Sequence, residues 1–139
     1  MPVRARLAML ACAAVAVPVA LAGCTNSQSS VNSRPHTGTA TASPVGGVQQ
    51  VTIEVGADDR FHPSTIVVHP GRVEIVLKHD AAGAPHNLSI GKPVNAFVPT
   101  IDSGRSSSTS FTAPAPGKYQ LVCTLHAKLG MTGTLVVEK

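Results

Sequence analysis

The chain of 139 residues contains no tryptophan, and aromatic residues make up only 3% of it. A hydrophobic core must therefore be built mainly from valine, leucine, isoleucine and alanine. Charged residues make up 13%, and lysines and arginines nowhere form a cluster or alternate with aromatic side chains. This pattern argues against nucleic-acid binding. With 43% hydrophobic residues, the chain has enough apolar side chains for one folded domain.

Cysteine pairs are also lacking. Cys12 and Cys24 lie in or directly after the hydrophobic N-terminal run, and Cys123 is the only cysteine beyond it. The remainder of the chain therefore cannot form an intrachain disulfide. In an exported protein a single cysteine is expected to be modified, paired between chains or bound to a metal.

Residues 1–23 are predicted to be a lipoprotein signal peptide. Two arginines precede an apolar run from Leu7 to Leu21, which is shorter than the roughly 20 residues of a spanning helix. The run ends in Leu21-Ala22-Gly23-Cys24, which resembles the lipobox of bacterial lipoproteins. That resemblance implies a lipid on Cys24 and an exported protein anchored to the extracytoplasmic face of the cell membrane. The alternative is ordinary signal cleavage near Ala22.

Residues 24–47 are predicted to be a flexible, lipid-anchored tether. From Thr25 to Gly47, 17 of 23 residues are Ser, Thr, Asn, Gln, Gly or Pro, and none is acidic. A random coil of this length spans about 25–30 Å. His36 lies in this segment, and we expect it to be solvated.

Residues 48–139 are predicted to be one all-β domain. Apolar residues alternate with polar ones in several short runs, as in Val51-Thr52-Ile53-Glu54-Val55, and no segment has an apolar stripe at helical spacing. Further runs lie around Val73–Leu77, Tyr119–Cys123 and Leu135–Val137, separated by turn-forming Pro-Gly and Ala-Gly pairs. With a further strand at Ser106–Phe111, this spacing predicts a β-sandwich of about seven strands, in which Gly91–Gly104 is a long loop.

Three side chains that bind metals lie close together near the C-terminus. Cys123, His126 and Met131 fall within nine residues, between one predicted strand and the next. A thiolate and a thioether favour Cu(I), while imidazole also suits Cu(II). Structural zinc would need four cysteine or histidine ligands, and a catalytic zinc site usually has a carboxylate or a third histidine. A hydrolase with Cys123 as nucleophile would need an orienting residue and a cleft, so we expect that the protein is not an enzyme.

The fourth ligand is predicted to be His86. It lies in Pro85-His86-Asn87, after the Ala82-Gly83 turn, and Asn87 could hold the cysteine loop by a hydrogen bond. His79 is the alternative to His86, but it precedes the turn. We expect His62, His69 and His79 to be solvated.

These motifs resemble those of the small cupredoxins, and plastocyanin and pseudoazurin most of all. Cys-Thr-Leu-His-Ala-Lys-Leu-Gly-Met has their C-x2-H-x4-M spacing, and the segments Lys78–Ile90 and Phe61–Gly71 resemble the first-histidine segment and the second strand of that family. The resemblance implies a Greek-key β-sandwich that holds one type 1 copper ion. Carried over by position, the ligands are His86, Cys123, His126 and Met131. Leu125 departs from the family, which often has proline there.

Two functions are compatible with this resemblance. In the first, the protein is a one-electron carrier in which copper alternates between Cu(I) and Cu(II), and the partner is a redox protein that the sequence does not identify. In the second, it is a copper-binding carrier or delivery lipoprotein of metal homeostasis. The two share one ligand set and differ in whether copper is released. We expect the chain to be a monomer.

Overall fold

The computed structural model describes residues 37–139. The expected signal peptide, the lipidation site Cys24, His36 and most of the tether lie outside these residues. Among residues 37–139, no helix is long and apolar enough to cross a membrane.

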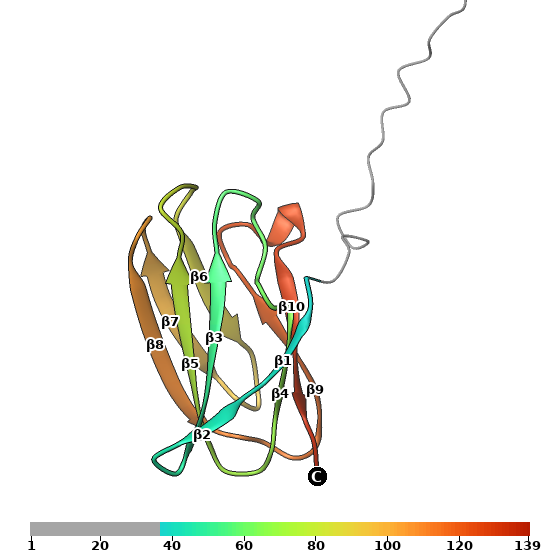
Figure 1. Ribbon diagram of the computed structural model, residues 1–139. Helices are drawn as coiled ribbons and strands as arrows, with labels where there is room; N and C mark the ends of the chain where they lie inside the picture. Colours follow the sequence, from blue (N-terminus) through green and yellow to red (C-terminus); the bar gives the residue numbers. More distant parts are fainter. Residues whose placement is uncertain (1–36) are drawn as a thin grey trace, which may run out of the picture.

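Strands make up almost all of the regular structure between residues 37 and 139 (Figure 1). The single helical turn described is the 3-10 helix η2 (Ala127–Leu129). The ten strands are β1 (Thr39–Thr41), β2 (Ser43–Val45), β3 (Val48–Val55), β4 (Thr65–Val68), β5 (Arg72–His79), β6 (His86–Ile90), β7 (Ala96–Ile101), β8 (Ser106–Thr112), β9 (Gly117–Val122) and β10 (Thr132–Val137).

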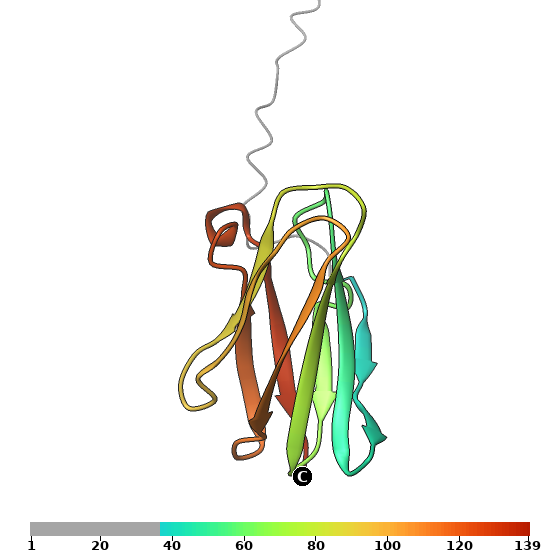
Figure 2. The same cartoon turned by 90° about the vertical axis from the view of Figure 1, so that its left-hand side faces the viewer.

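The strands form two sheets packed face to face. One sheet has the order β1-β4-β10-β9-β6-β7 and the other β2-β3-β5-β8. Figure 1 separates the two layers, with β3, β5 and β8 to the left of β9 and β10, and Figure 2 shows the same sandwich turned by 90°. The all-β sandwich expected from the sequence is confirmed.

The alternating residues of the predicted strands form the core. Along β3 and β5 every second side chain is buried, and Ile53, Ile75 and Leu77 have no exposed surface. Phe61, Leu121 and Leu135 close the space between the sheets with equally buried side chains. Valine, leucine and isoleucine therefore supply most of the core, as the shortage of aromatic residues requires.

The expected boundary of the tether at residue 47 is too late. Residues 39–45 form β1 and β2, of which β1 pairs in parallel with β4 and β2 pairs antiparallel with β3. Ala42 between them is buried. The partners of β1 lie 26 residues further along the chain, from Thr39↔Thr65 to Thr41↔Val67. A composition rich in Thr, Ser and Gly predicts flexibility locally and carries no information on such distant pairing.

The predicted long loop from Gly91 to Gly104 is also wrong in part. It contains β7, which pairs with β6 and buries Ala96, Val98 and Ile101. Pro99 and the flanking glycines hide the strand in the sequence, but β7 is the edge of its sheet, where a missing N–H is tolerated. With β1, β2 and β7, ten strands replace the expected seven or so.

Among the connections at the upper end of the sandwich in Figure 1, three lie around the predicted ligands. They are residues 56–64 between β3 and β4, residues 80–85 between β5 and β6, and residues 123–131 between β9 and β10. β3 and β5 run parallel, so both end there. The described chain also begins at this end, because Thr37 bonds Ser64 and Phe61, whereas the C-terminus lies at the lower end (Figure 1).

Candidate metal centre

Three of the four predicted ligands come together at the upper end. Donor atoms of His86, Cys123 and His126 all lie within 4.8 Å of one another. The Nδ1 atoms of the two histidines are 3.1 Å apart, and Sγ of Cys123 lies 3.9 Å from Nδ1 of His86 and 3.6 Å from Nδ1 of His126. His86 and Cys123 are fully buried, while the side chain of His126 is 16% exposed.

The cysteine loop is held by its own backbone. The N–H of Cys123 donates to the carbonyl of Met131, and the N–H groups of Leu129 and Met131 both donate to the carbonyl of His126. Gly130 takes a left-handed conformation after η2, with φ of 79°, which allows this tight reversal. Cys123, His126 and Met131 are thus fixed by contacts within nine residues.

His86 is held by a distant part of the chain. Its Nε2 lies 2.9 Å from the carbonyl oxygen of Gly56, 30 residues earlier. A carbonyl oxygen only accepts, so the proton is on Nε2, and the Nδ1 lone pair is left facing Cys123 and His126. The connection 80–85 packs closely on Gly56, because a Cβ on Gly83 would lie 2.7 Å from the backbone nitrogen of Ala57.

Burial lowers the pKa of His86 below its ordinary value. The nearby rings of His126 and His79 act in the same direction, whereas the Gly56 carbonyl and the Asp59 carboxylate oppose the shift. Because only neutral imidazole binds a metal ion, a lowered pKa keeps the His86 ligand available at neutral pH.

Asn87 ties the two parts of the site together. Its Oδ1 accepts from the backbone N–H of Thr124 at 2.8 Å, and its Nδ2 donates to the Thr124 hydroxyl at 2.8 Å. Thr124 follows Cys123, so this pair joins the strand that carries His86 to the loop that carries the thiol. This is the contact expected of Asn87 from the sequence.

His79 is buried, which contradicts the expectation that it is solvated. Its ring stacks on His86 with centroids 5.0 Å apart, and its two nitrogens lie 2.8 and 2.7 Å from the carbonyl oxygens of Asp80 and Ala84. His79 therefore supports the connection that precedes His86 and lies outside the cluster of three donors. The inward alternation of β5, in which Val73, Ile75 and Leu77 are buried, continues to His79 and was the signal for its burial.

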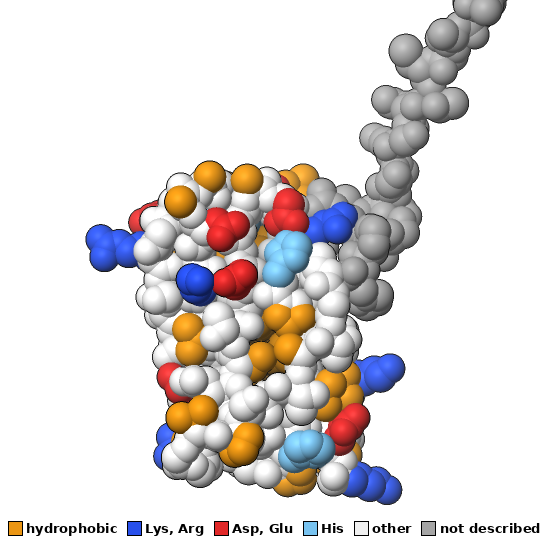
Figure 3. Space-filling model, viewed as in Figure 1, with side chains coloured by type: hydrophobic (Ala, Val, Ile, Leu, Met, Phe, Trp, Pro, Cys, Tyr) orange, Lys and Arg blue, Asp and Glu red, His pale blue; other side chains and the backbone are white. Residues whose placement is uncertain are grey.

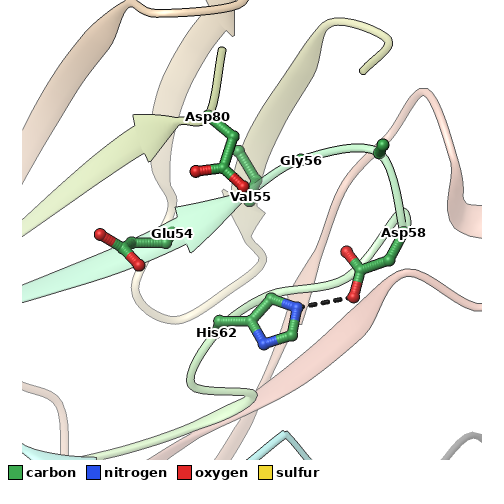
Figure 4. A pocket seen from close by; sticks show the side chains of 7 residues that line it. Glu54, Val55, Gly56, Asp58, His62 and Asp80 are labelled. Atoms are coloured by element: carbon green, nitrogen blue, oxygen red, sulfur yellow. Dashed lines mark hydrogen bonds and ion pairs between the residues drawn. The ribbon is translucent and has the colours of Figure 1, made fainter. Parts of the chain in front are cut away.

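A separate acidic pocket lies on the side of the upper end. Its volume is about 440 Å³, and Glu54, Asp58, His62 and Asp80 line it (Figure 4). Asp58 points at His62, and their side chains are 2.7 Å apart, while Glu54 pairs with Lys78 at 3.0 Å. Asp58 and Glu54 are therefore engaged with neighbouring basic groups.

The donor set fits copper. Two imidazoles and one thiolate, with a methionine as a weak further donor, are the ligands of blue-copper electron-transfer sites. Met131 is fully buried, and its backbone is bonded to that of Cys123 and His126, which keeps the residue beside the three donors. Fold and site together define a small β-sandwich protein with a soft metal centre at one end.

The comparisons with known proteins give the family. The profile described as "Cupredoxin-like domain" matches residues 13–137, and the chain belongs to this family. It is 32% identical over 105 residues to the chloroplast plastocyanin of Physcomitrium patens, covering 68% of this chain and 61% of that protein. It is 31% identical over 98 residues to the plastocyanin of Prochlorothrix hollandica, covering 63% and 72%. The chain thus spans less than two thirds of the first of these relatives.

Solved structures agree on the fold. Auracyanin A, a blue copper protein of Chloroflexus aurantiacus, aligns with a TM-score of 0.58 and 25% identity, over 66% of this chain and all of that one. The metal-binding domain of the Cu(I)-exporting P-type ATPase of Streptococcus pneumoniae aligns with a TM-score of 0.60 and 18% identity, over 76% of this chain and all of that domain. These findings and the donor cluster agree with the expected copper cofactor.

Sequence reasoning missed two groups at the site, the carbonyl of Gly56 and the carboxylate of Asp59. Oδ1 of Asp59 lies 3.9 Å from Nε2 of His86 and 3.9 Å from Nδ1 of His126. Neither residue belongs to a metal-binding motif, and both reach the site through folding of the connection 56–64. The Gly56-Ala57-Asp58-Asp59 turn after β3 gave no local signal of this contact.

Proposed function

We propose that the protein is a type 1 blue-copper electron carrier, anchored by a lipid on Cys24 to the extracytoplasmic face of the cell membrane. Bound copper would supply a one-electron couple between Cu(I) and Cu(II). The observation that carries the proposal is the cluster of His86, Cys123 and His126 at the end of a β-sandwich of the cupredoxin-like family. Met131 would complete the ligand set.

The surroundings of His126 suit electron exchange with a partner protein. Its ring is partly exposed, whereas the other two donors of the cluster are buried. Leu125 and Leu129 flank it and are 52% and 45% exposed, and Figure 3 shows hydrophobic side chains along the top edge of the molecule. An apolar rim lets a partner approach a desolvated ligand edge without burying a charge. The partner would be a redox protein.

The direct test is to add Cu(II) to the purified full-length protein. We expect an intense visible band from thiolate-to-copper charge transfer and a small parallel hyperfine splitting in the EPR spectrum. A colourless protein with an ordinary tetragonal spectrum would overturn the proposal.

Release of copper separates an electron carrier from a delivery protein. The three clustered donors lie at one site and the backbone keeps Met131 beside them, so reduction would require no ligand to be added or lost. Repeated reduction and reoxidation in the presence of a moderate Cu(I) chelator should leave copper on the protein. Rapid transfer to the chelator on reduction would favour delivery.

The anchor has its own test. Metabolic labelling with a fatty acid should mark the full-length protein and fail on Cys24→Ala. Cys12→Ala is the matched control, because it removes a thiol from the expected signal peptide and should leave the label unchanged. Label persisting on Cys24→Ala would refute the lipidation of Cys24.

A further inference from the structure

A carboxylate lies beside the two imidazoles of the metal centre. Asp59 belongs to the connection between β3 and β4, and its Oδ1 is 3.9 Å from Nδ1 of His126 and 3.9 Å from Nε2 of His86. Its side chain is 26% exposed. Both distances exceed that of a hydrogen bond, so Asp59 acts on these rings through its charge.

The backbone places this carboxylate by a defined turn. Asp59 has a left-handed conformation with φ of 53°, and its N–H donates to the carbonyl of Gly56 at 3.2 Å. The same carbonyl accepts a hydrogen bond from Nε2–H of His86. One turn therefore orients the His86 ring and brings the carboxylate to it. Aspartate and asparagine are the non-glycine residues that tolerate this conformation best.

We propose that Asp59 sets the redox balance of the site by favouring Cu(II) over Cu(I), and so lowers its reduction potential. This inference rests on the proposed copper function. A metal–imidazole bond is about 2.0 Å, so an ion on Nδ1 of His126 lies within about 6 Å of the carboxylate. A negative charge attracts a divalent ion more strongly than a monovalent one. At this separation and partial exposure, Asp59 changes the ratio of the two affinities about tenfold.

The 3.9 Å approaches of Asp59 to the two imidazoles add little to the stability of the fold. A partly exposed ion pair at this distance contributes little to folding. The charge of Asp59 acts instead on the copper ion that the buried donors would bind, and more strongly on Cu(II) than on Cu(I). Asp59 thus acts on the reduction potential through its charge, and the proposal does not require it to be a ligand.

Asp59→Asn is the decisive variant. It removes the charge and keeps both the size of the side chain and a residue that accepts the left-handed backbone. Asp58→Asn is the matched control, because it removes a neighbouring charge that is 48% exposed and is directed at His62, as Figure 4 shows.

The measurements are the dissociation constants of the metal-free protein for Cu(II) and for Cu(I), and the midpoint potential of the copper-loaded protein. We expect Asp59→Asn to weaken Cu(II) binding about tenfold more than Cu(I) binding, which raises the potential by about 59 mV for a one-electron couple. Asp58→Asn should change the ratio less than about threefold, because the exposed charge is screened.

Equal ratios for Asp59→Asn and Asp58→Asn would overturn the proposal, as would a lower potential in Asp59→Asn. A parent protein that binds Cu(II) without the blue spectrum would contradict the proposed function alone, because the ratio of the two affinities still measures the effect of Asp59.

Discussion

The two sides of the metal centre are built in different ways. Cys123, His126 and Met131 lie on one short loop that is closed by its own backbone hydrogen bonds. His86 is held from afar, by the carbonyl of Gly56 and by the stacked ring of His79. The loop therefore carries three of the four proposed ligands, and the contacts of the other side fix the position of the fourth, His86. Changes on the loop should alter the spectrum and the affinity of bound copper. Changes on the His86 side should alter the stability of the fold and the rate at which copper leaves.

The largest effect is expected on the loop side, from Cys123→Ser. Serine replaces the thiolate by a poor ligand for copper, so the visible band should disappear and the affinity for copper should fall steeply. The side chain is buried but similar in size, so the fold should persist at a cost of about 1–3 kcal/mol. Absorbance during titration with Cu(II) measures the loss of copper binding, and thermal unfolding of the metal-free protein measures the loss of stability. Retained blue colour would remove Cys123 from the ligand set.

Asn87→Ala tests the His86 side of the site. This change removes the bonds that join β6 to Thr124 and should lower the free energy of unfolding of the metal-free protein by about 1–3 kcal/mol. The blue band should remain, while copper should leave faster. Thr124→Ala is the control, since it keeps the backbone bond to Asn87 and should cost less. Denaturant unfolding and the rate of transfer to a chelator test this, and equal losses in both variants would contradict it.

A smaller effect is expected from Met131→Leu. The two side chains have similar volumes, so the buried position should tolerate the exchange at under about 1.5 kcal/mol. If the Met131 thioether is a weak ligand, its loss should keep the site blue and raise its reduction potential. Potentiometric titration gives the answer. A potential equal to that of the parent protein would show that Met131 is not an axial ligand.

The smallest effect concerns pH. Because the pKa of His86 is lowered in the folded metal-free protein, the unfolded chain takes up the proton more readily. Stability should thus be complete above the ordinary histidine value of 6.5 and should decline as the pH falls from there through the folded pKa. Unfolding measured from pH 8 downward should show a shallower decline in His86→Gln. An unchanged slope would mean that the ring of His86 is not desolvated.

The same contrast explains what could be predicted from the sequence. The three residues of the loop are close in the chain, so the spacing from Cys123 to Met131 predicted that they lie together. Period-two alternation likewise predicted β3 and β5, because each strand buries one face. His86 was predicted from its place in Pro85-His86-Asn87 after the Ala82-Gly83 turn, and the resemblance to a family supported that choice.

Features that depend on distant pairing could not be predicted. β1 has the composition of a tether and becomes a strand only because β4 offers it an edge. Asp59 is an ordinary turn residue until the connection after β3 folds against His86. His79 is the exception among the errors, because the alternation of β5 already placed it inside.

β1 and β2 run from the upper to the lower end before the chain turns back into β3. The described chain therefore begins and ends at opposite ends of the domain. The chain enters at Thr37, beside Ser64 at the upper end, whereas Val137 pairs with Gly117 near the lower end. A protein attached to an electrode at Thr37 would thus be held by the end that carries His126. Attachment at Lys139 would turn that end toward the solution, and the two orientations should give different electron-transfer rates with the same molecule.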